Sequence, residues 1–355
     1  MVSALALRDY RSYEKLALEL EPGLVLVTGP NGAGKTNLLE SLHVGTQGFS
    51  PRTRADAQLV RFGREAARVG LRGSRAGVAL DLEVTLELGS GKRATLNGAK
   101  LRAAEQLRGE VTTLVFTPDR LVVVKGGPAA RRAYFDRVLG RLAPSRASLS
   151  AEYGAAVGQR NAALRRVAQG VSSREALAPW NEQVSALAAE LVAGRHETVG
   201  SLQPGFAERA GELGLPQAEL RYEGEPPSVE QLEQRLERDL ERGATGIGPH
   251  LDGLGVLSAG RDLRTFGSQG EQRLAVLALL LGEAELLDER RGTRPLLLLD
   301  DVLSELDPDR RRILADRVRA SGQALITSAS RSALPGEAAQ TLEVSQRDDG
   351  TSEVR

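Results

Sequence analysis

The segment GPNGAGKT, Gly29–Thr36, carries the residue types that hold a chain of phosphates. It fits the pattern G-x-x-x-x-G-K-[S/T] and lies between an expected buried strand, LVLVTG, and an expected helix that starts near Lys35. Its glycines allow backbone N–H groups to converge on phosphate oxygens, and the N-terminus of the helix adds partial positive charge. We therefore predict that Lys35 reaches the β- and γ-phosphates of ATP and that the Thr36 hydroxyl ligates Mg²⁺. The predicted nucleotide contacts here are Gly29, Pro30, Asn31, Gly32, Ala33, Gly34, Lys35, Thr36 and Asn37.

A pair of carboxylates much later in the chain would complete this site. In the stretch PLLLLDDVLSELD, the run Leu296–Leu299 has the length and apolarity of a buried parallel strand. Asp300 follows at the carboxyl end of the strand, where open α/β sheets place their ligands, so we predict that it serves Mg²⁺. Asp301 is predicted to orient the attacking water. Taken alone, the pair would also suit the N-cap of a helix.

The segment GSQGEQR places small and amide-bearing residues before an apolar helix expected over residues 271–290. Ser268, Gln269 and Gly270 lie where free N–H groups of the helix form an anion site. Because the first segment already surrounds one nucleotide, we interpret this second site as one for the γ-phosphate held by another subunit. A loop with capping residues is the structural alternative.

The remaining pattern indicates an α/β frame with a helical insertion. Residues 68–101 alternate with period two and contain the turn signal Asn97-Gly98, which predicts an antiparallel β element. Residues 128–242 have helical spacing and are expected to break at prolines, including Pro204. Beyond residue 243 we expect short strands, a helix over 308–320, the strand ALITS and a frayed edge after Glu343. The predicted domains are 1–125, 126–245 and 246–355.

Composition excludes several other classes of site. The chain has 355 residues, 41% of them hydrophobic, and zero formal net charge. Without cysteine it has no disulfides or thiolate metal sites, and its three histidines are well separated. No apolar run is long enough for a transmembrane helix, so we expect a soluble, cytoplasmic protein without a membrane partner.

The order of these motifs resembles the ABC-type ATPase heads of DNA repair and chromosome maintenance. Walker A spans Gly29–Thr36, the signature Ser268–Glu271, Walker B Leu296–Asp300 and the D-loop Ser304–Asp307. More closely, the chain resembles the RecF family of bacterial recombination-repair proteins. The stretches that carry this likeness include LRDYRSY, VFTPDRLVVVKGGPAARRAYFDRVL, QRNAALR, GPHLDGL, GSQGEQR and DDVLSELD.

The resemblance implies an α/β fold: an ABC-type P-loop ATPase head with an antiparallel β element and an inserted helical lobe, without a long coiled coil. It implies a weak, DNA-dependent ATPase that uses ATP and Mg²⁺. Such a protein forms an ATP-dependent homodimer on double-stranded DNA near single-strand gaps and junctions. Its implied partners are RecR and RecO, with which it promotes RecA loading, and slow hydrolysis resets it.

The resemblance also assigns roles to single residues. Lys35, Asp301 and Ser268 take catalytic positions, with Ser268 contacting ATP across the dimer. Thr36 and Asp300 serve the metal, and Gln269, Gly270, Ser304 and Asp307 complete the nucleotide contacts. The chain departs from the family pattern at Glu271, where Gln is usual, at Leu251, where Arg is usual, and at Thr327 or Ser328, which replace a switch histidine. Gln47 is a candidate for the Q-loop, with a structural role as the alternative.

Two groups of arginines are candidates for DNA contact. One includes Arg52, Arg54 and Arg61, and the other begins with Arg131 and Arg132. Neither is interleaved with the aromatic residues that stack on single strands, so contacts to the phosphates of a duplex are the better interpretation. A charged, solvated surface is the structural alternative for both groups.

Two other function classes share part of this motif set. A nucleotide-binding subunit of a membrane transporter has the same Walker A, signature and D-loop motifs. A monomeric P-loop kinase or small NTPase needs Walker A alone. The long helical insertion disfavours the first, and the signature segment and D-loop have no use in the second.

Overall fold

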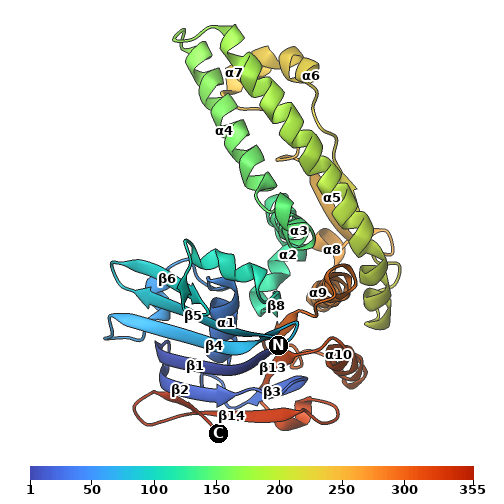
Figure 1. Ribbon diagram of the computed structural model, residues 1–355. Helices are drawn as coiled ribbons and strands as arrows, with labels where there is room; N and C mark the ends of the chain where they lie inside the picture. Colours follow the sequence, from blue (N-terminus) through green and yellow to red (C-terminus); the bar gives the residue numbers. More distant parts are fainter. The chain divides into compact units, whose positions relative to one another are not determined.

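The computed structural model describes residues 1–355 and separates into two compact units (Figure 1). The ATPase unit joins Met1–Arg120 to Leu287–Arg355, and the helical unit is the inserted segment Leu121–Leu286. The sequence predicted such an insertion, but over 126–245, so its second limit lies farther along the chain than expected. Strand pairing explains the difference. Strand β10 (Gly253–Ser258) pairs antiparallel with β9 (Glu219–Glu223), which keeps the signature segment that follows β10 in the helical unit.

The first sheet of the ATPase unit is antiparallel, with strand order β2-β1-β4-β5-β6-β7. Its side chains alternate between the core and the solvent because successive residues of a strand face opposite sides. Asn97 and Gly98 both have positive φ and form the tight turn that the sequence predicted between the last two strands. The strands span Val2–Tyr10 (β1), Tyr13–Glu19 (β2), Ala66–Arg75 (β4), Val78–Glu87 (β5), Gly91–Leu96 (β6) and Ala99–Lys100 (β7).

The second sheet has the order β15-β14-β3-β13-β12-β8 and is parallel except for β15. Its central strands are buried on both faces, which explains their continuous apolar runs. The strands are Leu24–Thr28 (β3), Thr113–Phe116 (β8), Leu296–Leu299 (β12), Ala324–Ser328 (β13), Gln340–Gln346 (β14) and Ser352–Val354 (β15).

The end of the chain is not the frayed edge that the sequence predicted after Glu343. Strand β14 pairs with β3, and β15 folds back along β14. Leu342 and Val344 are buried at alternate positions of β14 and anchor this hairpin in the core. The weak apolar pattern concealed this packing because only alternate residues of β14 are buried.

Helix α1 (Lys35–Gln47) packs against both sheets and is buried along most of its length. Leu38 and Leu42 of the helix belong to one apolar cluster with Val69 and Leu71 of the antiparallel sheet and with residues of the parallel sheet. The first turn of α1 is therefore held from two sides. In the second half of the unit, α10 (Pro308–Ala320) matches the predicted helix 308–320.

The helical unit contains two long helices, α4 and α5, that pack along one another (Figure 1). Helix α5 continues through Pro204, where the sequence predicted a break. Leu202 and Phe206, on either side of this proline, are both fully buried, so tertiary packing holds the helix together there. The helices of this unit are Val122–Lys125 (α2), Pro128–Leu142 (α3), Leu149–Ala168 (α4), Ala178–Glu212 (α5), Val229–Gln234 (α6), Leu236–Arg242 (α7), Leu263–Phe266 (α8) and most of Gln269–Arg291 (α9), with β11 at Arg261–Asp262.

Among the helices of the chain, none combines the length and the apolarity that a membrane crossing requires.

A buried ion pair joins helices within the helical unit. Arg160 of α4 is fully buried, and its Nη1 donates to Asp239 of α7 at 2.8 Å and to Thr245 at 2.8 Å. Its Nε donates to Asn181 of α5, also at 2.8 Å. One guanidinium thus links α4 to two other helices, α5 and α7, and to the loop that leads back toward β10. Buried charges require this complete set of partners.

We predict that Arg160→Ala lowers the free energy of unfolding by about 3–5 kcal/mol, because it leaves the Asp239 carboxylate buried without its cation. Urea unfolding followed by the fluorescence of the single tryptophan, Trp180 in α5, measures this unit directly. Arg166→Ala, at an exposed position of the same helix, is the matched control and should change stability by less than about 0.5 kcal/mol. Equal unfolding curves for the two variants would contradict the structural role of the ion pair.

Candidate functional site

The loop between β3 and α1 has the backbone of a phosphate cradle. Gly29, Gly32 and Gly34 all have positive φ, at 146°, 83° and 115°, a region that favours glycine. Gly34 is the N-cap of α1, so the free N–H groups of the first helical turn lie at the loop. The predicted segment Gly29–Thr36 therefore forms the loop between strand β3 and helix α1 that this motif requires.

Lys35 is held over the loop by backbone carbonyls. Its Nζ donates to the oxygen of Gly29 at 2.7 Å and to that of Pro30 at 2.9 Å. Partial burial lowers the pKa of Lys35, while the nearby carboxylates of Asp301 and Asp300 oppose that shift. A cation in this position, with carboxylates on one side, suits an anionic phosphate chain.

Walker A and Walker B meet through one hydrogen-bonded contact. The Thr36 hydroxyl lies 3.0 and 2.9 Å from the two carboxylate oxygens of Asp300. Asp300 is 7% exposed, and desolvation raises its pKa although hydroxyl donors act in the opposite direction. The two metal-site residues predicted from the sequence are therefore brought together.

Thr327 at the end of β13 organises this contact, a role that sequence reasoning missed. Its hydroxyl donates to Asp300 Oδ1 at 2.8 Å and accepts the N–H of Asp301 at 2.8 Å. Strand β13 lies between β3 and β12 in the sheet, so its carboxyl end lies between the two Walker motifs. The sequence did contain an indication of this role, because Thr327 or Ser328 of the ALITS strand was expected at the position of a switch histidine.

Asp301 differs from the buried carboxylate beside it in exposure and backbone conformation. Its side chain is exposed and its backbone has φ 48°, the left-handed region that non-glycine residues rarely adopt. The Thr327 hydroxyl bonds its N–H, and the Ser304 hydroxyl donates to its carbonyl at 3.1 Å. Backbone strain supported by two hydrogen bonds is typical of a functional position.

The donor chemistry at Thr36 and Asp300 fits Mg²⁺. Hydroxyl and carboxylate oxygens are hard ligands, and Mg²⁺ usually takes only one or two of them from the protein, with phosphate and water as the rest. The chain contains no group of three or more His, Cys, Asp or Glu residues arranged around a metal site. The two side chains would hold the ion, and the remaining ligands would come from the nucleotide.

Polar residues outside the Walker motifs support the N-terminal half of α1, and the sequence had not indicated Arg11 or Glu40 among them. Arg11 makes a two-pronged ion pair with Glu40, with both N–O distances at 2.9 Å. Arg52, predicted as a DNA contact, donates to Asn37 at 3.2 Å and to Glu40 at 3.4 Å. Arg52 thus belongs to the surroundings of the nucleotide helix. Gln47 is buried and donates to the carbonyl of Val111 at 2.8 Å, which is the structural alternative considered above.

The signature segment begins α9 in the helical unit. Ser268, Gln269 and Gly270 are exposed, as a site for a partner's phosphate requires. The Glu271 carboxylate accepts the N–H and the hydroxyl of Ser268, both at 2.8 Å, and this contact lowers the pKa of Glu271. The Ser268 oxygen accepts the N–H of Glu271 in return. Glu271 therefore occupies the donors that a phosphate would use. The segment caps its own helix, as in the structural alternative, and the residue that does so is the glutamate found where the family usually has glutamine.

The D-loop residues differ in their surroundings. Asp307 is exposed and caps α10 by accepting the N–H of Arg310 at 2.9 Å. This bond lowers the pKa of Asp307. Ser304 supports Asp301, as described above. The structure therefore gives each residue a local role beside the predicted nucleotide contact.

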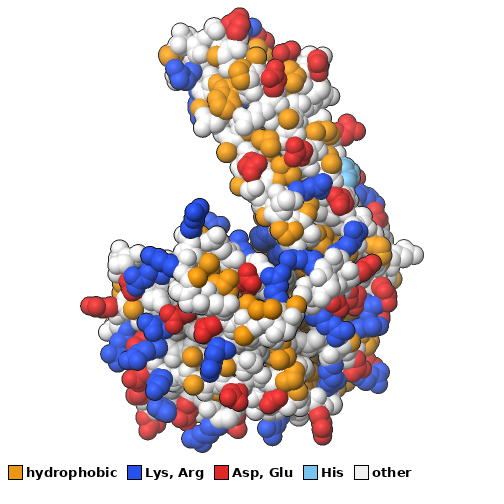
Figure 2. Space-filling model, in the orientation of Figure 1, with side chains coloured by type: hydrophobic (Ala, Val, Ile, Leu, Met, Phe, Trp, Pro, Cys, Tyr) orange, Lys and Arg blue, Asp and Glu red, His pale blue; other side chains and the backbone are white.

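The arginines predicted to contact DNA divide into buried and exposed members. Arg131 is only 4% exposed and pairs with Asp262, so a direct DNA contact is not retained for it. Arg132 donates to the carbonyl of Asp252 at 2.7 Å within the helical unit. Arg61 pairs with Glu14 at 3.1 Å, whereas Arg54 is exposed. On the face of the ATPase unit in Figure 2, basic and acidic side chains are mixed rather than segregated.

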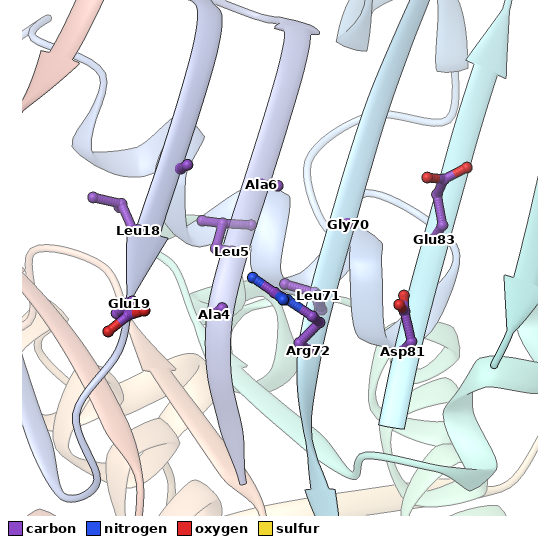
Figure 3. Close-up of a pocket in the computed structure, with 11 residues that line it drawn as sticks. Ala4, Leu5, Ala6, Leu18, Glu19, Gly70, Leu71, Arg72, Asp81 and Glu83 are labelled. Atoms are coloured by element: carbon purple, nitrogen blue, oxygen red, sulfur yellow. The ribbon is translucent and has the colours of Figure 1, made fainter. Parts of the chain in front are cut away.

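A separate hollow lies on the exposed face of the antiparallel sheet (Figure 3). Small residues of β1 and β4, including Ala4, Ala6 and Gly70, leave this space of about 500 Å³. Arg72 and Asp81 lie along its side. Its residues include no set of groups that could perform the nucleotide chemistry, which stays with Walker A and Walker B.

Comparison with known proteins gives one consistent family. A model described as the RecF/RecN/SMC N terminal domain matches residues 1–353. A DNA replication and repair protein RecF from Acidothermus cellulolyticus is 39% identical over 348 residues, covering 92% of this chain and 93% of the relative. The protein of the same name from Symbiobacterium thermophilum is 37% identical over 343 residues, covering 92% and 90%.

Solved structures agree with the sequence relatives. The recombination mediator protein RecF-ATP in the RecFOR pathway superposes with a TM-score of 0.87 and 27% identity, covering 100% of this chain and 97% of that one. An Smc head bound to the C-winged helix domain of ScpA has a TM-score of 0.63 at 17% identity and shares the fold alone. With this fold, its joined Walker motifs and its relatives, the chain belongs to the RecF family of DNA replication and repair proteins.

Proposed function

We propose that this protein is an ATP-dependent clamp on duplex DNA that acts near single-strand gaps during recombinational repair. The observation that carries this proposal is the contact between Thr36 and Asp300 beneath a glycine cradle. It supplies a nucleotide and metal site of the kind that the family uses. ATP is supported further by the similar RecF structure described with ATP.

The side chains suggest how slow hydrolysis proceeds at this site. Lys35 binds the phosphate chain and offsets the charge that develops on it. Asp301, exposed beside the buried Asp300, orients a water for attack on the γ-phosphate. Thr36 and Asp300 would hold Mg²⁺, which would supply positive charge against the charge of the phosphates. Water attack yields ADP and phosphate, which resets the clamp.

Dimerisation by ATP follows from the exposed signature segment. Ser268 of one protomer would donate to the γ-phosphate bound by the partner, with Gln269 and Gly270 beside it. The phosphate must first replace Glu271 at the Ser268 donors. ATP therefore joins two protomers only while its γ-phosphate is present.

DNA contact is assigned to exposed arginines of the ATPase unit. Arg54 and Arg64 are exposed in the segment after α1, and Phe62 between them is fully exposed. Arg61 contributes from the same segment. Such residues would contact backbone phosphates and give affinity without reading sequence. The RecFOR pathway named for the structural relative supports RecR and RecO as partners. With them the protein would promote RecA loading.

The first test is the solution mass of Asp301→Asn, measured by light scattering with and without Mg·ATP. We expect a shift from monomer to dimer only when Mg·ATP is present, because the variant retains the nucleotide contacts but does not cleave ATP. Lys35→Met should remain a monomer because it loses the cation that binds phosphate. A monomer of Asp301→Asn with ATP shown to be bound would refute the clamp.

Ser268→Arg tests the contact between protomers. We expect it to bind ATP like the wild type and to remain a monomer, because the bulky side chain blocks the partner's phosphate. Light scattering in parallel with an ATP titration separates the two effects. A normal ATP-dependent dimer would show that the signature does not act across the interface.

Arg54→Glu tests the DNA surface. We expect weaker duplex binding and a salt dependence whose slope is reduced by roughly one, as expected for one lost phosphate contact. Fluorescence anisotropy over a series of salt concentrations measures both quantities. Arg166→Glu, exposed on α4, is the charge-matched control. Equal slopes for the two variants would remove Arg54 from the DNA surface.

A further inference from the structure

The β14–β15 hairpin reaches the phosphate cradle through the pairing of β14 with β3. The two strands run parallel, and Glu343 lies opposite Thr28, the last residue before the cradle. The next residue of β14, Val344, directs its carbonyl to the space that a side chain on Gly29 would occupy. The first glycine of Walker A is thus required because β14 passes directly beside it.

Strand β15 brings Ser352 against the other end of the cradle. Ser352 is 3% exposed, and its hydroxyl donates to the carbonyl of Ala33 at 2.6 Å. A side chain on Gly34 would collide with the same hydroxyl. Ser352 Oγ also lies 2.8 Å from the hydroxyl of Ser12. The Ala33 carbonyl can only accept, so the single hydroxyl hydrogen of Ser352 is donated to it. Ser352 Oγ therefore accepts the hydrogen bond from the Ser12 hydroxyl.

The neighbouring carbonyl of the cradle is held in the same way. The Tyr13 hydroxyl donates to the oxygen of Gly34 at 3.1 Å, and Tyr13 is fully buried. Two successive carbonyls, those of Ala33 and Gly34, therefore receive hydrogen bonds from segments far away in the sequence. Both donors lie in the ATPase unit.

These bonds determine where the N–H groups of the cradle point. The carbonyl oxygen and the next N–H of a trans peptide lie in one plane and point in opposite directions. The Ala33 carbonyl, held by Ser352, therefore orients the N–H of Gly34. The Gly34 carbonyl, which accepts from both Tyr13 and the N–H of Leu38, orients the N–H of Lys35. These are N–H groups of the loop that binds phosphate oxygens.

We propose that Ser352, with Tyr13, is a positioning residue for ATP: the β14–β15 hairpin orients the cradle and so sets its affinity for the phosphate chain. This inference rests on the proposed binding of ATP at Walker A. It gives the last strands of the chain a role in nucleotide binding that their sequence does not reveal.

The test compares Ser352→Ala and Tyr13→Phe with wild-type protein in titrations with a fluorescent ATP analogue and Mg²⁺. We expect each variant to bind about fivefold more weakly, the effect of one lost hydrogen bond. In steady-state hydrolysis, KM for ATP should rise while kcat stays near the wild-type value, because Asp301 is untouched. Tyr13→Phe keeps the buried ring and tests the idea even if Ser352→Ala folds poorly.

Ser345→Ala is the matched control, since its hydroxyl donates to Glu353 on the same hairpin at 3.2 Å. It should bind ATP like the wild type. Thermal unfolding of all variants distinguishes positioning from general support. Lower melting temperatures with unchanged ATP affinity in Ser352→Ala and Tyr13→Phe would overturn the inference. Absence of ATP binding by the wild type would instead overturn the proposed nucleotide site, and the inference with it.

Discussion

The Asp300 carboxylate is the group around which the nucleotide site is built. It receives hydroxyls from Thr36 at the start of α1 and from Thr327 at the end of β13. A carboxylate buried to this degree is costly unless donors surround it, and desolvation raises its pKa despite them. The parallel order β3-β13-β12 supplies these donors, because neighbouring parallel strands end at the same edge of the sheet.

Two adjacent aspartates acquire different properties from this arrangement. Asp300 is buried and bonded to hydroxyls, which suits a stationary metal ligand. Asp301 is exposed, because its left-handed backbone turns the chain and Thr327 holds its N–H. The unfavourable backbone conformation is thus offset by bonds from β13 and Ser304. One hydroxyl, that of Thr327, orders both residues.

The signature segment obeys a different constraint because it belongs to the helical unit. Ser268 and Glu271 satisfy one another as a capping box, a common way to complete the N-terminus of a helix. The same donors are those that a phosphate would use. Capping and phosphate binding therefore compete for the same donors. The negative charge of Glu271 disfavours the bound phosphate more than a neutral glutamine would.

The sequence by itself determined the parts that depend on local backbone chemistry and periodicity. Gly29–Thr36, the strand Leu296–Leu299 and helix α10 follow from glycine conformations, apolar runs and helical spacing, so each was predicted where it lies. The resemblance to the family could also be recognised, because the order of its motifs along the chain is visible in a single sequence. The local turn at Asn97-Gly98 was recognisable for the same reason.

Only the tertiary structure decided which residues surround these motifs. Arg131 has the same residue type as Arg54, yet one is buried against Asp262 and the other is exposed. The helical unit extends to Leu286 because β9 and β10 pair across a long separation. Pro204 stays within α5 because its buried neighbours hold the helix. Ser352 reaches Ala33, far along the chain, because β14 pairs with β3. Contacts of this kind leave no local pattern, since they arise from burial and strand order that the whole chain creates together.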